Sequence, residues 1–253
     1  MTRSTKKSAP PSQAALGLRL DEKILHSLDR FYPGSANSVA LAAAKSFARG
    51  ALQKVFVITG KPKSGKSHLL RGVYHRWPAS KKENRFFFDA KDGSGLPAPL
   101  LSAGLERPSA GAPVLVCIDN LDLPSGDADK FYEDVFNLFN RLSDSGGCLA
   151  VALRPSPAVC AKIPDYLSSR LLTGMVVTLT KPDDEEMKLI LDKIGADRSI
   201  GLTPKARDYI LERSGRSIHD LLELMDRLES SLEPGSRRVG LQLLKRVINW
   251  IQP

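Results

Sequence analysis

Hydrophobic residues fall into two kinds of segment along the chain, short apolar runs and longer stretches with helical spacing. The run at Val55–Ile58 is apolar throughout and predicts a buried strand. Similar strands are expected at residues 84–89, 114–119, 149–153 and 175–179. Helical spacing lies between them, as at residues 131–142. Strands that alternate with helices predict an α/β domain with a parallel, doubly wound sheet.

The pattern changes near residue 180, where only helical spacing follows. An acid-started helix is expected over residues 183–194, and Thr203 and Pro204 supply the N-cap and first turn of a second helix. Two more helices are expected at residues 217–232 and 241–251. A small all-helical domain, residues 181–253, is therefore expected after an α/β domain of residues 19–180.

The strand at Val55–Ile58 breaks into a recognisable loop. Residues 60–67 fit G-x-x-x-x-G-K-[ST] at every fixed position, and a helical pattern follows. Backbone N–H groups of such a loop surround phosphate, and the helix N-terminus adds a favourable dipole. Lys66 is expected to reach the β- and γ-phosphates, and Ser67 to hold Mg²⁺. The nucleotide-contacting residues expected here are Gly60, Lys61, Pro62, Lys63, Ser64, Gly65, Lys66, Ser67 and His68.

A carboxylate ends the strand at residues 114–119. Asp119 would lie beside the phosphate loop, where Mg²⁺ needs a second protein ligand, although an aspartate that merely ends a strand is common. The next residue, Asn120, cannot accept a proton from an attacking water molecule. We therefore expect ADP or ATP with Mg²⁺ to bind, with Asp119 and Asn120 at the reacting end, but only weak hydrolysis.

Composition narrows the class of protein. The 253 residues are 42% hydrophobic with a net charge of +9, and no stretch is apolar for long enough to span a membrane. The first residues lack the apolar region of a secretory signal, and three widely spaced cysteines favour reduced thiols in the cytoplasm. The basic balance fits non-specific contact with DNA and a solvated basic surface equally well.

The motifs together resemble a known family. The segments FYPGSAN, GKSHLL, CIDN, RPSP and SSRL, followed by a helical lid, look like the AAA+ module of DnaA, the bacterial replication initiator. The likeness covers residues 13–251 and is greatest to Hda, the shortened homologues that inactivate DnaA. It implies a P-loop AAA+ parallel-sheet domain, a small helical lid, and a chain that ends without a DNA-binding domain.

The resemblance also implies partners. Hda-like proteins bind ADP, attach to the DNA polymerase III sliding clamp and promote hydrolysis on ATP-bound DnaA. The arginine that matches their trans-acting finger is Arg170, whose guanidinium could contact γ-phosphate oxygens. A surface or salt-bridged arginine is the alternative, and the position of Arg170 favours the finger. Gln13, Leu16 and Leu18 fit the clamp-binding hexapeptide at residues 13–18, after a basic Pro/Ser-rich tail of residues 1–12 that we expect to be disordered.

Other family positions are less well matched. Leu153 stands at the sensor 1 position and cannot orient water or phosphate. His219 stands at the sensor 2 position, where relatives have arginine, and Arg216 could substitute for it. By analogy, Phe31, Tyr32 and Pro33 would lie near the adenine.

Three functions are therefore open from the sequence. The first is an Hda-like regulator, expected to be a homo-oligomer, most simply a dimer, in the bacterial cytoplasm at the nucleoid or replisome. The second is a stand-alone ATPase or helicase-loader-like motor, against which Asn120 counts. The third is a nucleic-acid-binding P-loop adaptor, which a steep salt dependence of DNA affinity would favour.

Overall fold

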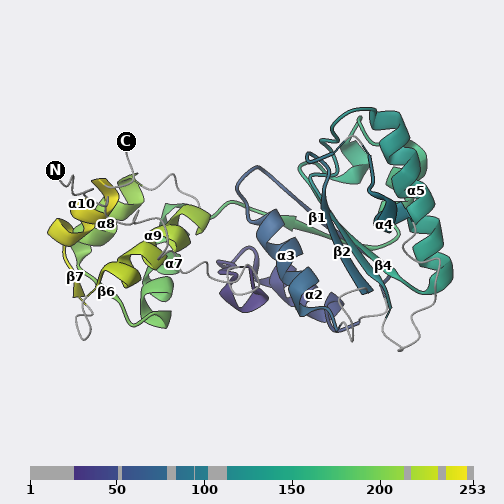
Figure 1. Ribbon diagram of the computed structural model, residues 1–253. Helices are drawn as coiled ribbons and strands as arrows, with labels where there is room; N and C mark the ends of the chain where they lie inside the picture. The colour runs from purple at the N-terminus through teal and green to yellow at the C-terminus, as the bar shows by residue number, and fades with distance from the viewer. Residues whose placement is uncertain are drawn as a thin grey trace, which may run out of the picture.

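A computed structural model describes residues 26–50, 53–78, 84–93, 95–101, 113–213, 218–232 and 238–249 (Figure 1). Its strands are β1 (Val55–Gly60), β2 (Arg85–Asp89), β3 (Leu115–Asp119), β4 (Cys148–Leu153), β5 (Met175–Leu179), β6 (Gly201–Leu202) and β7 (Arg238–Val239). Its helices are α2 (Ser38–Phe47), α3 (Lys66–Arg76), α4 (Ala98–Leu101), α5 (Ala128–Ser145), α6 (Asp165–Leu171), α7 (Asp184–Asp197), α8 (Pro204–Arg213), α9 (Ile218–Ser231) and α10 (Leu241–Asn249). Two 3₁₀ turns, η2 (Leu28–Arg30) and η4 (Pro157–Val159), complete the described elements.

The first five strands form one parallel sheet in the order β2-β3-β4-β1-β5. β1 pairs with β4 on one side and with β5 on the other, so the strand before the phosphate loop lies inside the sheet. All five strands were predicted from the apolar runs, and β5 has the predicted bounds. The parallel, doubly wound α/β fold is therefore confirmed.

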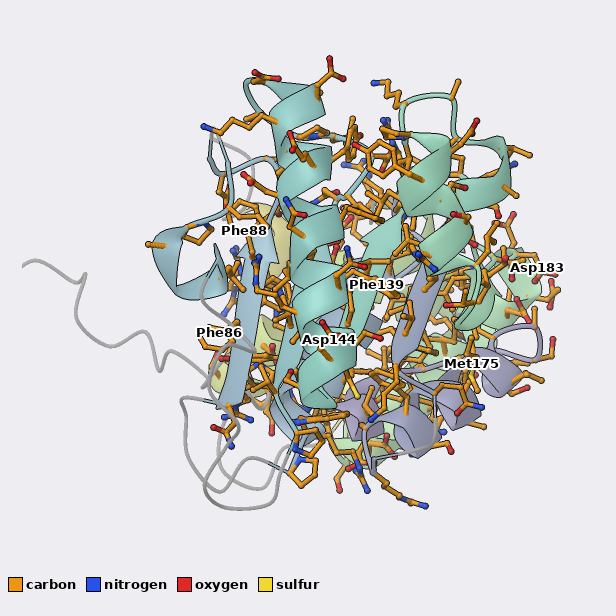
Figure 2. The ribbon with its side chains drawn as sticks, turned by 90° about the vertical axis from the view of Figure 1, so that its right-hand side faces the viewer. Phe86, Phe88, Phe139, Asp144, Met175 and Asp183 are labelled. Carbon is orange, nitrogen blue, oxygen red and sulfur yellow. The ribbon has the colours of Figure 1, made fainter. Side chains whose placement is uncertain are left out.

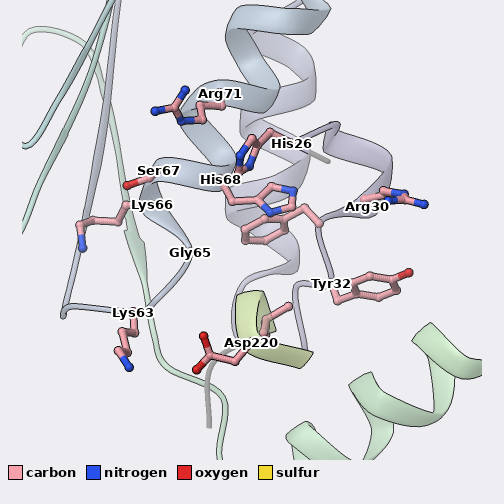
Figure 3. A pocket seen from close by; sticks show the side chains of 12 residues that line it. His26, Arg30, Tyr32, Lys63, Gly65, Lys66, Ser67, His68, Arg71 and Asp220 are labelled. Carbon is pink, nitrogen blue, oxygen red and sulfur yellow. The ribbon is translucent and has the colours of Figure 1, made fainter. Parts of the chain in front are cut away.

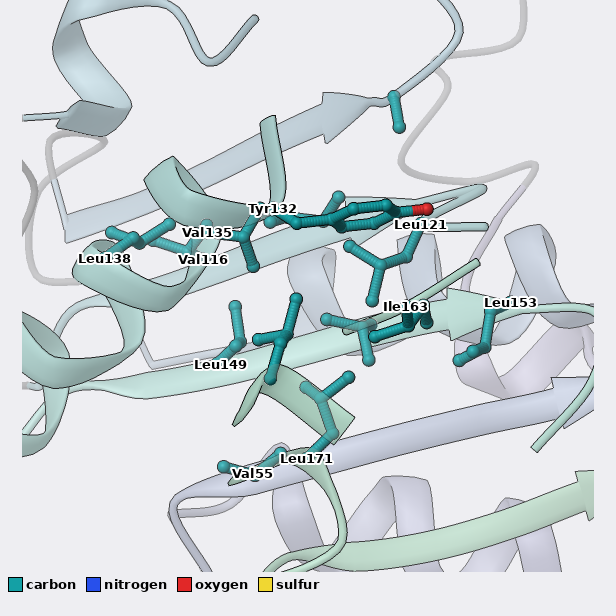
Figure 4. Packing of buried hydrophobic residues seen from close by; sticks show 14 of the residues in the cluster. Val55, Val116, Leu121, Tyr132, Val135, Leu138, Leu149, Leu153, Ile163 and Leu171 are labelled. Carbon is teal, nitrogen blue, oxygen red and sulfur yellow. The ribbon is translucent and has the colours of Figure 1, made fainter. Parts of the chain in front are cut away.

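Each face of the sheet is covered by its own helices. Alternate residues of β1 point to opposite sides: Val55 and Val57 pack under α5 and α6, whereas Phe56 and Ile58 pack under α2 and α3. Figure 4 shows the first of these cores, where side chains from β1, β3 and β4 meet those of α5 and α6. In Figure 2 this face is seen with α5 across it, and Phe86 and Phe88 of β2 extend the apolar surface.

Capping side chains and a glycine mark the ends of several helices. The Asp127 carboxylate accepts a hydrogen bond from the Lys130 N–H (3.1 Å) at the start of α5, and Asp183 does the same for Glu186 (2.8 Å) at the start of α7. α5 ends at Gly146, whose φ of 78° suits a glycine C-cap. Thr203 caps α8 as predicted, since its hydroxyl accepts from the Ala206 N–H (3.3 Å).

The helices after residue 180 share a separate apolar core. α7, α8, α9 and α10 bury a set of aliphatic side chains against one another, including Ile194, Leu221 and Leu244. The prediction that this part is all helical is wrong in one respect, because β6 and β7 form a short parallel pair in which Leu202 lies opposite Val239. Two-residue strands are too short for alternation of apolar and polar residues to reveal them.

Residues 32–37 tie the sheet-containing part to the helical part. The Tyr32 hydroxyl donates to the Asp197 carboxylate (2.9 Å), and Ser35 donates to Glu186 from its N–H (2.9 Å) and its hydroxyl (2.6 Å). The buried Asn37 side chain donates to the Thr180 carbonyl (2.9 Å) and accepts from the Thr180 N–H (2.9 Å). These polar contacts fix the segment against both the end of the sheet and α7.

The three cysteines of the chain lie in its interior. Cys117, Cys148 and Cys160 are free and buried, and burial raises the pKa of the Cys117 and Cys148 thiols, which makes these two unreactive. Within the described ranges, no helix is both long and apolar enough to cross a bilayer.

Replacing the buried Asn37 by alanine should lower the free energy of unfolding by about 2 kcal/mol, because it removes the two hydrogen bonds between its side chain and the Thr180 backbone. Chemical denaturation monitored by circular dichroism measures the change. Val39→Ala, in the same helix at a side chain that is 75% exposed, serves as the control and should alter the value by less than about 0.5 kcal/mol. Equal values for the two variants would contradict the assigned role of Asn37.

Candidate phosphate-binding site

Two glycines shape the loop between β1 and α3. Gly60 has a φ of 147°, and a Cβ there would lie 2.4 Å from the Leu179 carbonyl oxygen, so no other residue fits. Gly65 has a φ of 96°, and its Cβ would come within 3.1 Å of the Phe31 ring. Between them, Lys63 also has a positive φ of 63°. The loop therefore takes a conformation that only the predicted glycine spacing allows.

Lys66 begins α3 with its side chain largely enclosed. It is 8% exposed, and its ammonium donates to the Lys61 carbonyl across the loop (2.9 Å). Burial lowers the pKa of Lys66, and the carboxylates of Asp119 and Asp122 act in the opposite direction. A cation held in this way at a helix N-terminus is suited to an anionic ligand.

Ser67 lies against the carboxylate that ends β3. Its hydroxyl hydrogen-bonds Asp119, whose other contact is the Asn120 N–H (2.9 Å to Oδ1). Asp119 is 2% exposed; burial raises its pKa, while the hydrogen bonds from Ser67 and Asn120 lower it. The two residues predicted to share Mg²⁺ are thus in direct contact.

The Asn120 side chain is hydrogen-bonded to the end of β2. With a φ of 53°, it turns its amide toward β2 and donates to both carboxylate oxygens of Asp89 (2.9 and 3.0 Å). The residue after Asp119 therefore offers an amide that is already engaged, rather than a base. Asp89 in turn accepts the Lys91 N–H (3.0 Å), so its oxygens are also occupied.

A cavity of about 470 Å³ opens beside this loop (Figure 3). It is lined by His26, Arg30, Phe31, Tyr32, Lys63, Gly65, Lys66, Ser67, His68, Arg71, Ile218 and Asp220. Residues 26–32 and the start of α3 form most of its wall, and α9 closes it from the helical part, from which Asp220 points inward. The cavity thus joins a cationic end at the loop to an aromatic end at Phe31 and His68.

Phe31, Tyr32 and Pro33, which were expected near the adenine, have different surroundings. Phe31 packs edge-on against His68 (5.6 Å between ring centroids), and His68 in turn lies edge-on to His26 (5.4 Å). Tyr32 lines the cavity, but its ring is directed away from the loop and is buried in the core of the helical part. Pro33 is not among the lining residues.

Several other predicted positions lie outside this cavity. Gly60 and Ser64 support the loop from within, whereas Lys61 and Pro62 line a second cavity on its other side. Leu153 is fully buried in the core under α5 and α6, so it does not reach the loop at all. His219 is part of α9, but its side chain is not described; Arg216, Gln13, Leu16 and Leu18 lie outside the described residues.

Arg170 lies away from both cavities. It is in the last turn of α6 with an exposed side chain, and within the described part of the chain its guanidinium has neither a hydrogen-bond acceptor nor a carboxylate partner. The preceding Ser168 is buried and donates to the Pro157 carbonyl (2.9 Å), which fixes this face of the helix. Arg170 is therefore presented to solvent on a rigid element.

Two acidic residues near the loop, and the arginine that one of them holds, were not predicted from the sequence. Asp89 ends β2 and Asp122 lies three residues after Asp119; Asp122 binds Arg154, which follows β4. Their positions could have indicated a role, because each residue comes at or just after the carboxyl end of a parallel strand, where ligands bind in open α/β sheets.

Relatives of the chain are found by sequence, although no protein-family model matches it. An uncharacterised protein of Haemophilus influenzae is 28% identical over 225 residues, covering 88% of this chain and 93% of the relative. The chromosomal replication initiator protein DnaA of Zymomonas mobilis is 24% identical over 266 residues, covering 97% of this chain. The chain spans about half the length of the DnaA relatives that it matches (52% of this one).

Solved structures share its fold. Domain III of the replication initiation protein DnaA from Thermotoga maritima superposes with a TM-score of 0.65 at 20% identity, over 90% of this chain and 98% of that one. AMPPCP-bound DnaA from Aquifex aeolicus gives a TM-score of 0.62 at 20% identity, over 90% of this chain and 69% of that one. The chain is thus similar in sequence to DnaA proteins and shares the fold of DnaA domain III.

Proposed function

We propose that this chain is an Hda-like regulator of replication initiation: it binds an adenine nucleotide at its P-loop and uses Arg170 to promote ATP hydrolysis on DnaA. The observation that carries the proposal is a contrast between two sites. The chain's own loop has the groups to hold phosphate but no free base after Asp119, whereas Arg170 is exposed and unpaired among the described residues.

The residues present fit a nucleotide with Mg²⁺. The Ser64 hydroxyl is buried inside the loop without a hydrogen-bond partner among the described residues, as expected of a group that awaits a ligand or water. Lys66 and the N–H groups at the start of α3 would hold the phosphates, and Ser67 and Asp119 would hold Mg²⁺. When bound, the metal would neutralise phosphate charge. That the Aquifex relative binds AMPPCP supports an adenine nucleotide, either ADP or ATP, in the cavity beside Phe31 and His68.

The chain's own turnover should be weak. The Asn120 amide nitrogen donates to both carboxylate oxygens of Asp89, and an amide cannot accept a proton from an attacking water molecule. Leu153 is buried in the apolar core, where it cannot contact phosphate. A strong stand-alone motor is disfavoured by the same two observations.

Arg170 would instead act on a partner. An exposed guanidinium stays charged and can make two parallel hydrogen bonds to phosphate oxygens. Homology to DnaA makes the ATP form of DnaA the natural target. The hexapeptide Gln13–Leu18, outside the described residues, would bring the chain to the sliding clamp, and a cytoplasmic homo-oligomer, most simply a dimer, near the replisome follows from the same likeness.

Lys66→Ala should weaken binding of fluorescent ADP by at least about a hundredfold, because a buried charge-assisted contact to phosphate is lost. Equilibrium titration of the purified full chain measures the affinity. Lys54→Ala, an exposed lysine at the other end of β1, is the matched control and should leave the affinity unchanged. Equal affinity of the Lys66 variant and the unmodified protein would rule out the P-loop as the nucleotide site.

Arg170→Ala should leave ADP affinity as it is and reduce stimulation of DnaA ATP hydrolysis on clamp-loaded DNA by about 10³-fold or more, to background. Phosphate release from DnaA in a reconstituted reaction gives the rate. Arg49→Ala, another exposed arginine, controls for general loss of positive charge. The assignment is wrong if Arg170→Ala stimulates DnaA as well as the control does, or if the chain alone hydrolyses ATP rapidly without DnaA.

Replacing Gln13, Leu16 and Leu18 together by alanine should abolish binding to the sliding clamp, since the two leucines would enter its apolar pocket and Gln13 would bind at the rim. Surface plasmon resonance on immobilised clamp measures the binding. Nucleotide affinity should not change, which serves as the control for folding. Retained clamp binding would mean that this segment is an ordinary linker.

A further inference from the structure

Arg154 lies beside the phosphate loop, whereas the preceding Leu153 is buried in the core. It is the residue after β4, the strand that pairs directly with β1. Its carbonyl accepts the N–H of Gly60, the first residue of the loop (3.1 Å). Because the strands are parallel, the end of β4 and the start of the loop lie at the same edge of the sheet.

Its side chain is held by one edge only. Asp122, in the turn after β3, accepts the Arg154 Nε–H (2.7 Å) and the Arg154 backbone N–H (3.1 Å). The Asp122 side chain is 2% exposed, whereas the Arg154 side chain is 42% exposed. The terminal nitrogens of the guanidinium have no acceptor within the described ranges, so this arginine keeps donors available while it is anchored.

Arg154 lines a cavity together with residues of the phosphate loop. Asp122, Arg154, Lys61 and Pro62 line a second cavity of about 490 Å³, so the loop forms a wall common to both cavities. The charges of Asp122 and Arg154 both act on Lys66, the cation expected to hold the β- and γ-phosphates. The ion pair is thus close to the end of the loop where the last phosphate of a nucleotide would lie.

We propose that Arg154 is the group that distinguishes a nucleoside triphosphate from a diphosphate in this chain, with Asp122 as the carboxylate that holds it in the state described. This inference rests on the proposed binding of an adenine nucleotide at the P-loop. The Nε–H stays with Asp122, and the terminal nitrogens of the guanidinium remain available to donate to a γ-phosphate. A diphosphate has no group at this position, so those donors gain no partner from it.

The two residues then act on triphosphate affinity in opposite directions. Arg154 contributes charge-assisted hydrogen bonds to the γ-phosphate only. Asp122 opposes the γ-phosphate twice, because its negative charge offsets the charge of the guanidinium and also acts on Lys66. Removing the first should weaken triphosphate binding, and neutralising the second should strengthen it, while diphosphate binding changes little.

The test compares the affinities of ADP and of the non-hydrolysable triphosphate AMPPCP, both with Mg²⁺, by titration calorimetry on the full chain. Arg154→Ala should weaken AMPPCP about tenfold and leave ADP within about twofold, and Asp122→Asn should shift the ratio of affinities the other way. Arg76→Ala is the matched control, since Arg76 also pairs with an aspartate, Asp29, but at the far end of α3. It should leave the ratio unchanged.

Arg154→Ala leaves the buried Asp122 carboxylate unpaired, so the double variant D122N/R154A removes both charges and tests the same role without that cost. It should still lose affinity for AMPPCP relative to ADP. An unaltered ratio in the single and double variants, with ADP still bound, would overturn the role of Arg154 alone. Failure of the unmodified protein to bind either nucleotide would overturn the proposed function, and this assignment with it.

Discussion

The close contact at Gly60 is the constraint on which the site depends. At this residue the phosphate loop leaves β1, its N–H reaches the Arg154 carbonyl of the strand on one side, and its Cα lies against the Leu179 carbonyl of the strand on the other. A side chain there would separate β1 from β5. Because β1 pairs with both β4 and β5, the loop and the ends of these two strands lie at one edge of the sheet. Lys66 and Ser67, which follow the loop, lie at the same edge.

Electrostatic balance is the second requirement at this edge. Lys66 is a nearly buried cation, which is costly unless anionic groups are close. Three carboxylates end or follow neighbouring strands, and each is held by a different donor: Asp119 by Ser67, Asp89 by Asn120 and Asp122 by Arg154. Each donor keeps its carboxylate from acting freely on a bound phosphate. Under the proposed function, this arrangement would favour holding a nucleotide over hydrolysing it.

Local patterns in the sequence were enough to predict the parallel sheet and the phosphate loop. The apolar runs from Val55 onward gave the strands of the sheet, and the glycine spacing gave the loop, because both depend on residues that are neighbours in the chain. Contacts between distant residues could not be predicted in this way. The pair of Asp122 and Arg154 joins residues 32 apart, and Tyr32, expected near a base, buries its ring with helices more than 150 residues further on. No periodicity reveals such partners, since tertiary packing alone decides them. Exposure of Arg170 was likewise open until the packing of α6 was known.

The segment of residues 31–37 serves three parts of the molecule within seven residues. Phe31 faces Gly65 and the cavity, Tyr32 belongs to the core of the helical part, and Asn37 binds the chain where the sheet ends. Substitutions in separate parts of a protein usually have additive effects on stability, but residues that share partners do not behave in that way. A change in this segment and a change in α7 will therefore not combine as a simple sum, even when the two positions are far apart in the sequence. Tyr32 and Asp197, whose side chains hydrogen-bond directly, are one pair that such coupling joins.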